Sequence, residues 1–261
     1  MCSSDLTDGM NENGLAAHLL VLFKSDYGQR NEKVPGLSIL LWAQYYLDNF
    51  RTVDEAVRFT ETAPFQLVPF YDISIKRWIN LHLALEDAQG DSAIIEYING
   101  VAHIYHHPND TVITNDPSYD QQLINAKQYQ GLGGNKPLPG STNPQDRFVR
   151  ALYYLTYLPN AKSSQDELAA VLSIMENTSQ PYSMPTPLRP VVGYTVWHTV
   201  LDLTHGVYYF NSANNFNMLW VQLNQFNLKP GADVMELELV NQSKLTGDVT
   251  KMFKPVHLYS S

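Results

Sequence analysis

The chain has 261 residues, of which 44% are hydrophobic, so it can bury one large core or two small ones. Its 17 basic and 26 acidic residues give a formal net charge of −9 at pH 7. This balance argues against a nucleic-acid partner, which requires Lys and Arg gathered on one face. No apolar run approaches the roughly 18 residues that a membrane-spanning helix needs, so we expect no membrane partner.

The start of the chain reads differently from the rest. The one cysteine is Cys2, which excludes an internal disulfide. Residues 1–7 lack periodicity, and their back-translation resembles the end of a sequencing-library adapter. We therefore predict a non-native segment there, with a genuine short N-terminus as the alternative. Because no repeat and no low-complexity linker follows, we predict a single domain over residues 8–261.

Two helices and a strand are predicted near the start of that domain. A turn leads into an apolar run at residues 15–22, which predicts a buried strand. Residues 37–50 are apolar at most positions and predict a largely buried helix. Thr52 and Glu55 form a capping box that opens a second helix through about Thr62.

Strands are predicted next. Residues 78–85 alternate between apolar and polar, and residues 93–98 return after a Gly-Asp turn at 90–91, which predicts a hairpin. Two further short strands are predicted at residues 101–105 and 111–114.

Helical signals return in the middle of the chain. One helix is predicted after Pro117, and another begins at Pro144 with Asn143 as its cap. A capping box that starts at Ser164 opens a third helix, which includes residues 168–175.

The last part of the chain is predicted to be mostly strands. Residues 179–190 contain four prolines and predict an irregular loop. Antiparallel strands follow at 195–203, 207–211 and 218–223, the first two joined by a turn at 205–206. Strands thus come in hairpin groups with helices between the groups, which predicts an α+β chain with antiparallel sheets.

Several blocks of sequence together resemble one family. They are Thr-Asn-Asp-Pro-Ser-Tyr-Asp-Gln-Gln at 114–122, Leu-Pro-Gly at 138–140, Asp-Arg-Phe-Val-Arg at 146–150, and further matches within 81–97 and 197–210. These blocks resemble the choloylglycine hydrolase and penicillin V acylase family, a group of N-terminal nucleophile hydrolases with a cysteine nucleophile.

The resemblance implies a four-layer αββα sandwich of antiparallel sheets and a hydrolase of linear amides. The small-molecule substrate would be an N-acyl amide, such as a conjugated bile salt, penicillin V or an acyl homoserine lactone. No cofactor and no metal is implied, and a homo-oligomer is left open. The intact protein would be periplasmic or secreted.

The family's N-terminal portion, which carries the cysteine, an arginine and an aspartate, is not found in this sequence. We therefore expect an N-terminally incomplete fold and a chain that is inactive as written. The alternative function is a non-catalytic truncated relative that binds acylated small molecules.

The resemblance places the pocket roles on Asn115 and Arg147. Amide hydrolysis needs a nucleophile, a base and donors for the oxyanion. Asn115 would donate hydrogen bonds and Arg147 would be a fixed cation; a turn asparagine and a surface arginine are the alternatives. Val21 replaces the family's usual Asn or Tyr, so a substrate contact there must come from its backbone. Cys2 is expected not to be the nucleophile, because the few residues before Asp8 cannot supply a supporting strand.

A histidine cluster raises the alternative of a zinc site. His103, His106, His107 and Asp110 are close in sequence, and His82 could join them. Zinc ligands are usually held on defined elements with supporting partners, whereas these residues occupy a strand and an adjoining turn. We therefore predict exposed hairpin histidines and no metal.

Overall fold

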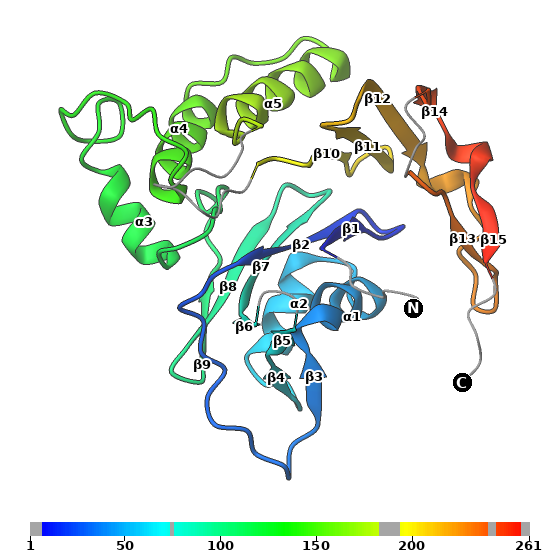
Figure 1. Ribbon diagram of the computed structural model, residues 1–261, viewed down its shortest axis with the longest axis horizontal. Helices are drawn as coiled ribbons and strands as arrows, with labels where there is room; N and C mark the ends of the chain where they lie inside the picture. Colours follow the sequence, from blue (N-terminus) through cyan, green and yellow to red (C-terminus); the bar gives the residue numbers. More distant parts are fainter. Residues whose placement is uncertain (1–6, 74–75, 183–193, 240–243, 257–261) are drawn as a thin grey trace. The chain divides into compact units, whose positions relative to one another are not determined.

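The structure, a computed structural model, describes most of the chain (Figure 1), in four ranges: residues 7–73, 76–182, 194–239 and 244–256. The chain separates into two compact units, one ending at Pro159 and the other beginning at Asn160. Each unit has its own sheet and its own helices.

The first unit is built on a five-stranded antiparallel sheet of order β1-β2-β7-β8-β9. Its strands are β1 (Asp8–Met10), β2 (Leu15–Val21), β7 (Leu81–Asp87), β8 (Ser92–Ile98) and β9 (Val101–Tyr105). The strands predicted at 15–22, 93–98 and 101–105 are confirmed, within one residue at each end.

One face of this sheet is apolar, because strand side chains alternate between the two faces. Leu15, Leu83, Leu85 and Ile95 lie on this face with no exposed area. Two helices cover it, α1 (Trp42–Asn49) and α2 (Val53–Thr60) (Figure 1).

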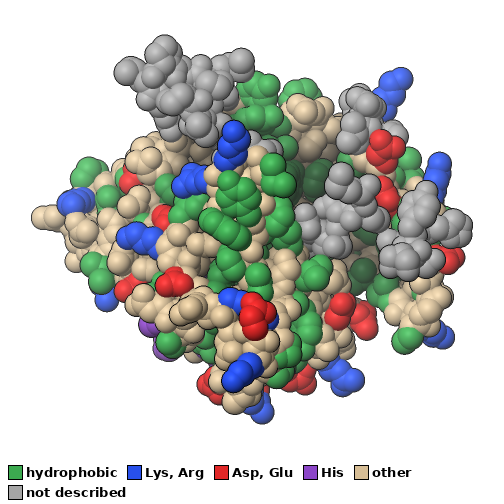
Figure 2. All heavy atoms as spheres, turned by 60° about the horizontal axis from the view of Figure 1, so that its bottom comes forward, with side chains coloured by type: hydrophobic (Ala, Val, Ile, Leu, Met, Phe, Trp, Pro, Cys, Tyr) green, Lys and Arg blue, Asp and Glu red, His purple; other side chains and the backbone are tan. Residues whose placement is uncertain are grey.

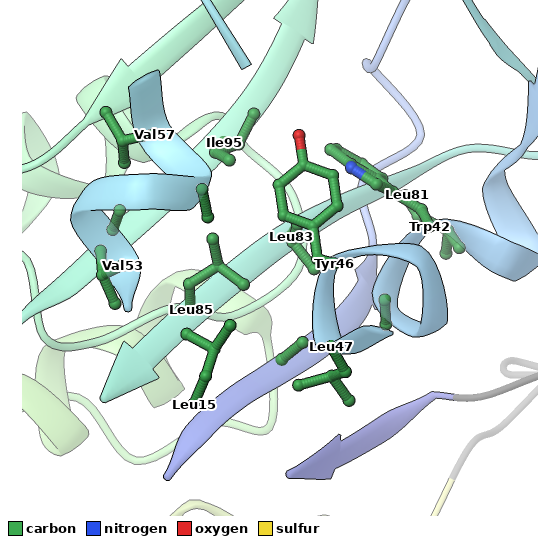
Figure 3. Packing of buried hydrophobic residues seen from close by; sticks show 14 of the residues in the cluster. Leu15, Trp42, Tyr46, Leu47, Val53, Val57, Leu81, Leu83, Leu85 and Ile95 are labelled. Carbon is green, nitrogen blue, oxygen red and sulfur yellow. The ribbon is translucent and has the colours of Figure 1, made fainter. Parts of the chain in front are cut away.

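Figure 3 shows the residues that meet between these layers, with Trp42 and Tyr46 of α1 and Val53 and Val57 of α2 directed toward the leucines of the strands. Trp42 and Tyr46 meet edge to face, with ring centroids 6.3 Å apart. Each large side chain buried in this way stabilises the fold by roughly 1.5–3 kcal/mol.

Both helices begin later and end earlier than predicted. The helix expected from residue 37 is preceded by β3 (Gly36–Ser38) and a 3-10 turn (Ile39–Leu41). In the second, the Thr52 hydroxyl accepts a hydrogen bond from Glu55 N at 3.2 Å. The Glu55 carboxylate accepts from Arg51 N rather than from Thr52 N, so the capping box is only half formed.

The strand predicted at 78–85 is wrong as one element, because it breaks at Asn80. Residues before the break belong to β6 (Arg77–Ile79), which pairs with β5 (Phe70–Asp72). Residues after it belong to β7 in the large sheet. The Asn80 side chain donates to Ser25 O at 2.7 Å, and its backbone carbonyl accepts from Leu22 N at 3.0 Å. A second small pair, β3 with β4 (Gln66–Val68), is parallel.

Two more helices complete the first unit: α3 (Tyr119–Ala126) and α4 (Pro144–Thr156). Both were predicted, and Asn143 occupies the cap position of α4, although its side chain makes no capping bond. The strand predicted at 111–114 is wrong. Thr114 instead directs its hydroxyl to Pro144 O at 3.1 Å, so this segment is held by side chains and not by a ladder.

The second unit has a four-stranded sheet of order β10-β11-β12-β14, antiparallel except for the last pair. Its elements are α5 (Ser164–Thr178), β10 (Trp197–Asp202), β11 (Val207–Ser212), β12 (Asn215–Gln222), β14 (Gly247–Asp248), the separate pair β13 (Val234–Glu236) and β15 (Lys254–Val256), and the 3-10 turns Leu223–Gln225 and Thr250–Met252.

Predictions for this unit are confirmed for the three long strands and for the turn at 205–206, where Gly206 has a φ of 67°. The cap of α5 is Ser163 and not Ser164, because the Ser163 hydroxyl accepts from Asp166 N at 3.2 Å. The loop predicted at 179–190 lies mostly outside the described residues.

The α+β class with mainly antiparallel sheets is confirmed. Among the described residues, no helix combines the length and apolarity that crossing a membrane requires. Figure 2 shows Lys and Arg side chains interspersed with Asp and Glu on the face in view.

Candidate active site

Asn115 lies in the loop between β9 and α3, half-buried, and its side chain joins two distant parts of the first unit. The Asn115 Nδ2 group donates to the carbonyl of Val21, at the end of β2, at 2.9 Å. Its Oδ1 accepts from Arg147 Nη2 at 2.8 Å. The structure therefore brings together the three residues Val21, Asn115 and Arg147.

The nature of these partners determines how the Asn115 amide is oriented. A guanidinium has only donors, so the amide oxygen must face Arg147. A backbone carbonyl has only acceptor sites, so the NH2 group must face Val21. An NH2 group carries two N–H bonds, and Val21 takes one of them. The second has no hydrogen-bond partner among the described residues.

Arg147 is positioned by α4, whose first residue is Pro144. Its Nε donates to Thr142 O at 3.2 Å while Nη2 reaches Asn115, so two sides of the planar guanidinium are fixed. Burial, and then the nearby Arg150, lower the pKa of the Arg147 guanidinium. Because its ordinary value is far above neutral, the group remains a cation. The expected alternative of a fully exposed surface arginine does not hold.

Arg150, one turn further along α4, has a different role. It is 8% exposed and donates from Nη1 to Pro139 O at 3.2 Å and to Ser141 O at 2.8 Å. It therefore anchors the Leu-Pro-Gly segment that precedes α4.

A second contact ties the same loop to the end of β2. The Asp116 Oδ2 atom accepts from Phe23 N at 3.0 Å. Asn115 and Asp116 thus hold two backbone groups, Val21 O and Phe23 N, that follow each other closely in the chain. The peptide bond between Asp116 and Pro117 is cis.

A buried pair that the sequence analysis missed lies behind this loop. His82 Nδ1 and Glu96 Oε1 are 2.9 Å apart, and their side chains are 1% and 0% exposed. Both Glu96 oxygens also accept from Tyr119 N, the first residue of α3, at 3.1 Å. His82, which the zinc alternative would have added to the exposed histidines, lies instead on the central strand β7 and pairs with Glu96. The signal available in the sequence was the apolar run Leu-His-Leu-Ala-Leu at 81–85, which places His82 among apolar residues.

The other members of the histidine cluster have separate partners. His103, His106 and His107 are exposed, as predicted. His106 Nε2 lies 2.8 Å from the Asp91 carboxylate, and Asp110 accepts from the Tyr119 hydroxyl at 2.9 Å. Within the described ranges no group of three or more His, Cys, Asp or Glu side chains is arranged to hold a metal ion.

The arrangement can stabilise developing negative charge, because an oriented amide N–H lies beside a fixed cation. The described residues contain no cysteine, since Cys2 lies outside them. The nucleophile is thus not part of the geometry described above.

Comparisons with known proteins agree with this chemistry. A family model described as linear amide C-N hydrolases, choloylglycine hydrolase family, matches residues 2–240. The match takes in part of the segment predicted to be non-native.

Two curated proteins illustrate the range of relatives. Penicillin V acylase of Pectobacterium atrosepticum is 43% identical over 266 residues, which are 95% of this chain and 71% of that protein. Bile salt hydrolase/transferase of Clostridium perfringens is 26% identical over 251 residues, 85% of this chain and 73% of that protein.

Solved structures show the same fold. Penicillin V acylase from Agrobacterium tumefaciens is 40% identical with a TM-score of 0.85, over 97% of this chain and 78% of that chain. A mutant conjugated bile acid hydrolase from Clostridium perfringens has a TM-score of 0.72 at 22% identity, over 85% of this chain and 74% of that chain. The latter likeness concerns the fold alone.

Proposed function

Because the chain belongs to the choloylglycine hydrolase family of linear amide C–N hydrolases, we propose that Asn115 and Arg147 form the oxyanion-stabilising wall of a cysteine-dependent amidase. The observation that carries the proposal is the Asn115 amide, oriented between a cation and a carbonyl with one N–H left over. Val21 contributes through its backbone, as the carbonyl that aims this amide.

The chemistry follows from where charge develops. A thiolate attacks the amide carbonyl, and the carbonyl oxygen becomes an oxyanion as the tetrahedral intermediate forms. The second N–H of Asn115 donates to that oxygen. Arg147 adds a fixed positive charge, which also favours a nearby thiol in its thiolate form. One preorganised donor of this kind typically lowers the barrier by about 2.7–4 kcal/mol.

Penicillin V and related phenoxyacyl amides are the proposed substrate class. Two relatives named penicillin V acylase are 43% and 40% identical to this chain, whereas the bile salt relative from Clostridium perfringens is 26% identical. The higher identity to the two penicillin V acylases favours the phenoxyacyl substrate, and pocket shape would decide among acyl groups.

A binding protein without hydrolytic activity is the second candidate. It rests on the Asn115 amide and the Arg147 cation, which can hold a carbonyl oxygen without taking part in bond cleavage. In that case the Asn115 wall would bind the carbonyl of an N-acyl amide without cleaving it.

The first experiment measures release of free amine from penicillin V, taurocholate, glycocholate and acyl homoserine lactones. It uses three purified proteins: the chain itself, its Cys2→Ala variant, and an extended form expressed with the coding sequence upstream of the first codon. We expect penicillin V to be the substrate that the active form hydrolyses fastest. Hydrolysis by the unextended chain that Cys2→Ala abolishes would make Cys2 the nucleophile. If neither form cleaves any substrate while penicillin V still binds, the protein binds N-acyl amides without hydrolysing them.

The second experiment tests the wall itself. Asn115→Asp keeps an acceptor for Arg147 but has no N–H for the oxyanion and directs an acceptor at Val21 O. We expect kcat of the active form to fall about 10²–10³-fold. The matched control is Asn143→Asp, at an exposed position whose side chain makes no capping bond. Equal kcat values for the two variants would remove Asn115 from the mechanism.

A further inference from the structure

Gln122 is a buried polar residue that the proposed mechanism does not use. It lies one turn into α3 and is only 2% exposed. Glutamine is mostly found at the surface, and when buried its amide needs partners. The partners of Gln122 are not on its own helix but in the loop that carries Asn115.

The Gln122 NH2 group contacts the site residue directly. Its Nε2 donates to the backbone carbonyl of Asn115 at 3.1 Å. A carbonyl only accepts, so the nitrogen of the Gln122 amide must face it. This bond fixes the peptide plane from which the Asn115 side chain leaves the backbone.

The same nitrogen is also linked, through the Thr114 hydroxyl, to the helix that carries Arg147. Gln122 Nε2 also donates to Thr114 Oγ1 at 3.1 Å, and that hydroxyl donates onward to Pro144 O at 3.1 Å. Pro144 is the first residue of α4, which carries Arg147. One buried amide is therefore linked both to the residue that donates to the oxyanion and to the helix of the neighbouring cation.

The other end of the Gln122 amide has no such partner. Gln122 Oε1 is buried and has no hydrogen-bond partner among the described residues. A buried unpaired oxygen is unfavourable, and an apolar side chain of the same length would avoid it. The donor function of Nε2 is what an apolar residue would lose.

We propose that Gln122 is a positioning residue of the amide-hydrolysing site, acting by holding the Asn115 backbone so that the free N–H of Asn115 points at the substrate oxygen. The proposal rests on the oxyanion role of Asn115. Small displacements of such a donor reduce the rate more than they reduce substrate binding.

The test compares Gln122→Met and Gln122→Glu with Gln121→Met and Gln121→Glu on the exposed neighbouring position. The first readout is the side-chain amide NMR signal of Asn115 in the full chain, assigned by its loss in Asn115→Asp. We expect Gln122→Met to shift this signal and to speed its hydrogen exchange about tenfold, with no change in the Gln121 variants. The second readout is kcat and KM for penicillin V in the hydrolysing form, where we expect kcat to fall about tenfold and KM to stay constant.

Gln122→Glu separates hydrogen bonding from packing. Glutamate has nearly the same shape as glutamine, but its side chain can donate a hydrogen bond only when the carboxyl group is protonated. The Asn115 signal and kcat, each taken relative to Gln121→Glu, should recover as the pH is lowered. A role in packing predicts no such recovery and would overturn the proposal, as would an unchanged Asn115 signal in Gln122→Met. If Asn115→Asp leaves hydrolysis intact, the oxyanion role fails on its own, while the NMR comparison still decides whether Gln122 positions Asn115.

Discussion

At the scale of single residues, the candidate site depends on hydrogen-bond partners of opposite kinds. Asn115 can serve as a directed donor only because Arg147 offers no acceptor and the Val21 carbonyl offers no donor. The two bonds remove the rotational ambiguity of the amide. The rigidity of the guanidinium matters as much as its charge, since the same group also binds Thr142 O.

Arg147→Lys tests this rigidity. A lysine ammonium group keeps the charge but has no planar fork, so we expect it to lose one of the two contacts. The free energy of unfolding, measured in urea, should fall by about 1.5–3 kcal/mol. Arg58→Lys is the control, because Arg58 is an exposed arginine of α2 paired with Asp54. There a change below about 0.5 kcal/mol is expected; a similar loss in both variants would contradict the argument.

At the scale of elements, α3 begins with an unusual cap. Ser118 occupies the cap position, but its hydroxyl donates to Asp120 and not to the backbone. The N–H at the start of the helix is satisfied instead by Glu96 of β8. A negative charge at a helix N-terminus is favourable, and this one also joins α3 to the large sheet.

Glu96→Ala is therefore expected to lower the free energy of unfolding by about 3–5 kcal/mol, because it leaves His82 and the first N–H of α3 buried without their partner. Chemical denaturation followed by circular dichroism measures the change. A loss below about 1 kcal/mol would mean that the carboxylate does not anchor the helix.

The control is Glu86→Ala on β7, where a partly exposed glutamate pairs with His18 at 3.0 Å. Burial alone would lower the pKa of His18, but Glu86 and, to a smaller extent, Asp8 together outweigh it and the pKa is raised. The stabilisation from this pair is therefore complete below about pH 6.5 and is lost as the pH rises through the raised value. Its size should be no more than about 1 kcal/mol.

Local sequence predicted those elements whose ends are marked by local chemistry. Pro144 and the hairpin turn at 90–91 are such marks, and α4 and β8, which begin beside them, are confirmed. The break at Asn80 and the loop at 111–114 could not be predicted, because their side chains bond to residues distant in sequence, Ser25 and Pro144. His82 and Gln122 were missed for the same reason. The roles of Asn115 and Arg147 came from family resemblance, and they stay predictions.

At the scale of the whole molecule, the described chain has two compact units, and the candidate site lies in the first. Each unit has its own buried cluster, around Leu83 in the first and around Leu219 in the second. The count of one domain stays a prediction, and it has a thermodynamic consequence. In a single cooperative domain, loss of either cluster weakens the whole fold.

Leu83→Ala and Leu219→Ala test this count. Each removes a side chain that is at most 3% exposed, so each should cost about 2–5 kcal/mol. For one domain, both variants should shift the same unfolding transition, measured by calorimetry and by fluorescence. Ile124→Ala, at a residue 65% exposed, is the control and should change little. Two transitions, each moved by only one of the core variants, would show two domains.

The contact between Asn115 and Val21 has a further consequence at the edge of the large sheet. Leu19 N bonds toward the β1 side of β2 and Leu22 N toward β7, so the Val21 carbonyl points to the β1 side, past Asp8, the first residue of β1. Asn115 occupies this carbonyl, which an added strand would otherwise use. Removing the amide frees a strand-pairing group for another molecule, so loss of catalysis and a gain in self-association would arise from the same side chain.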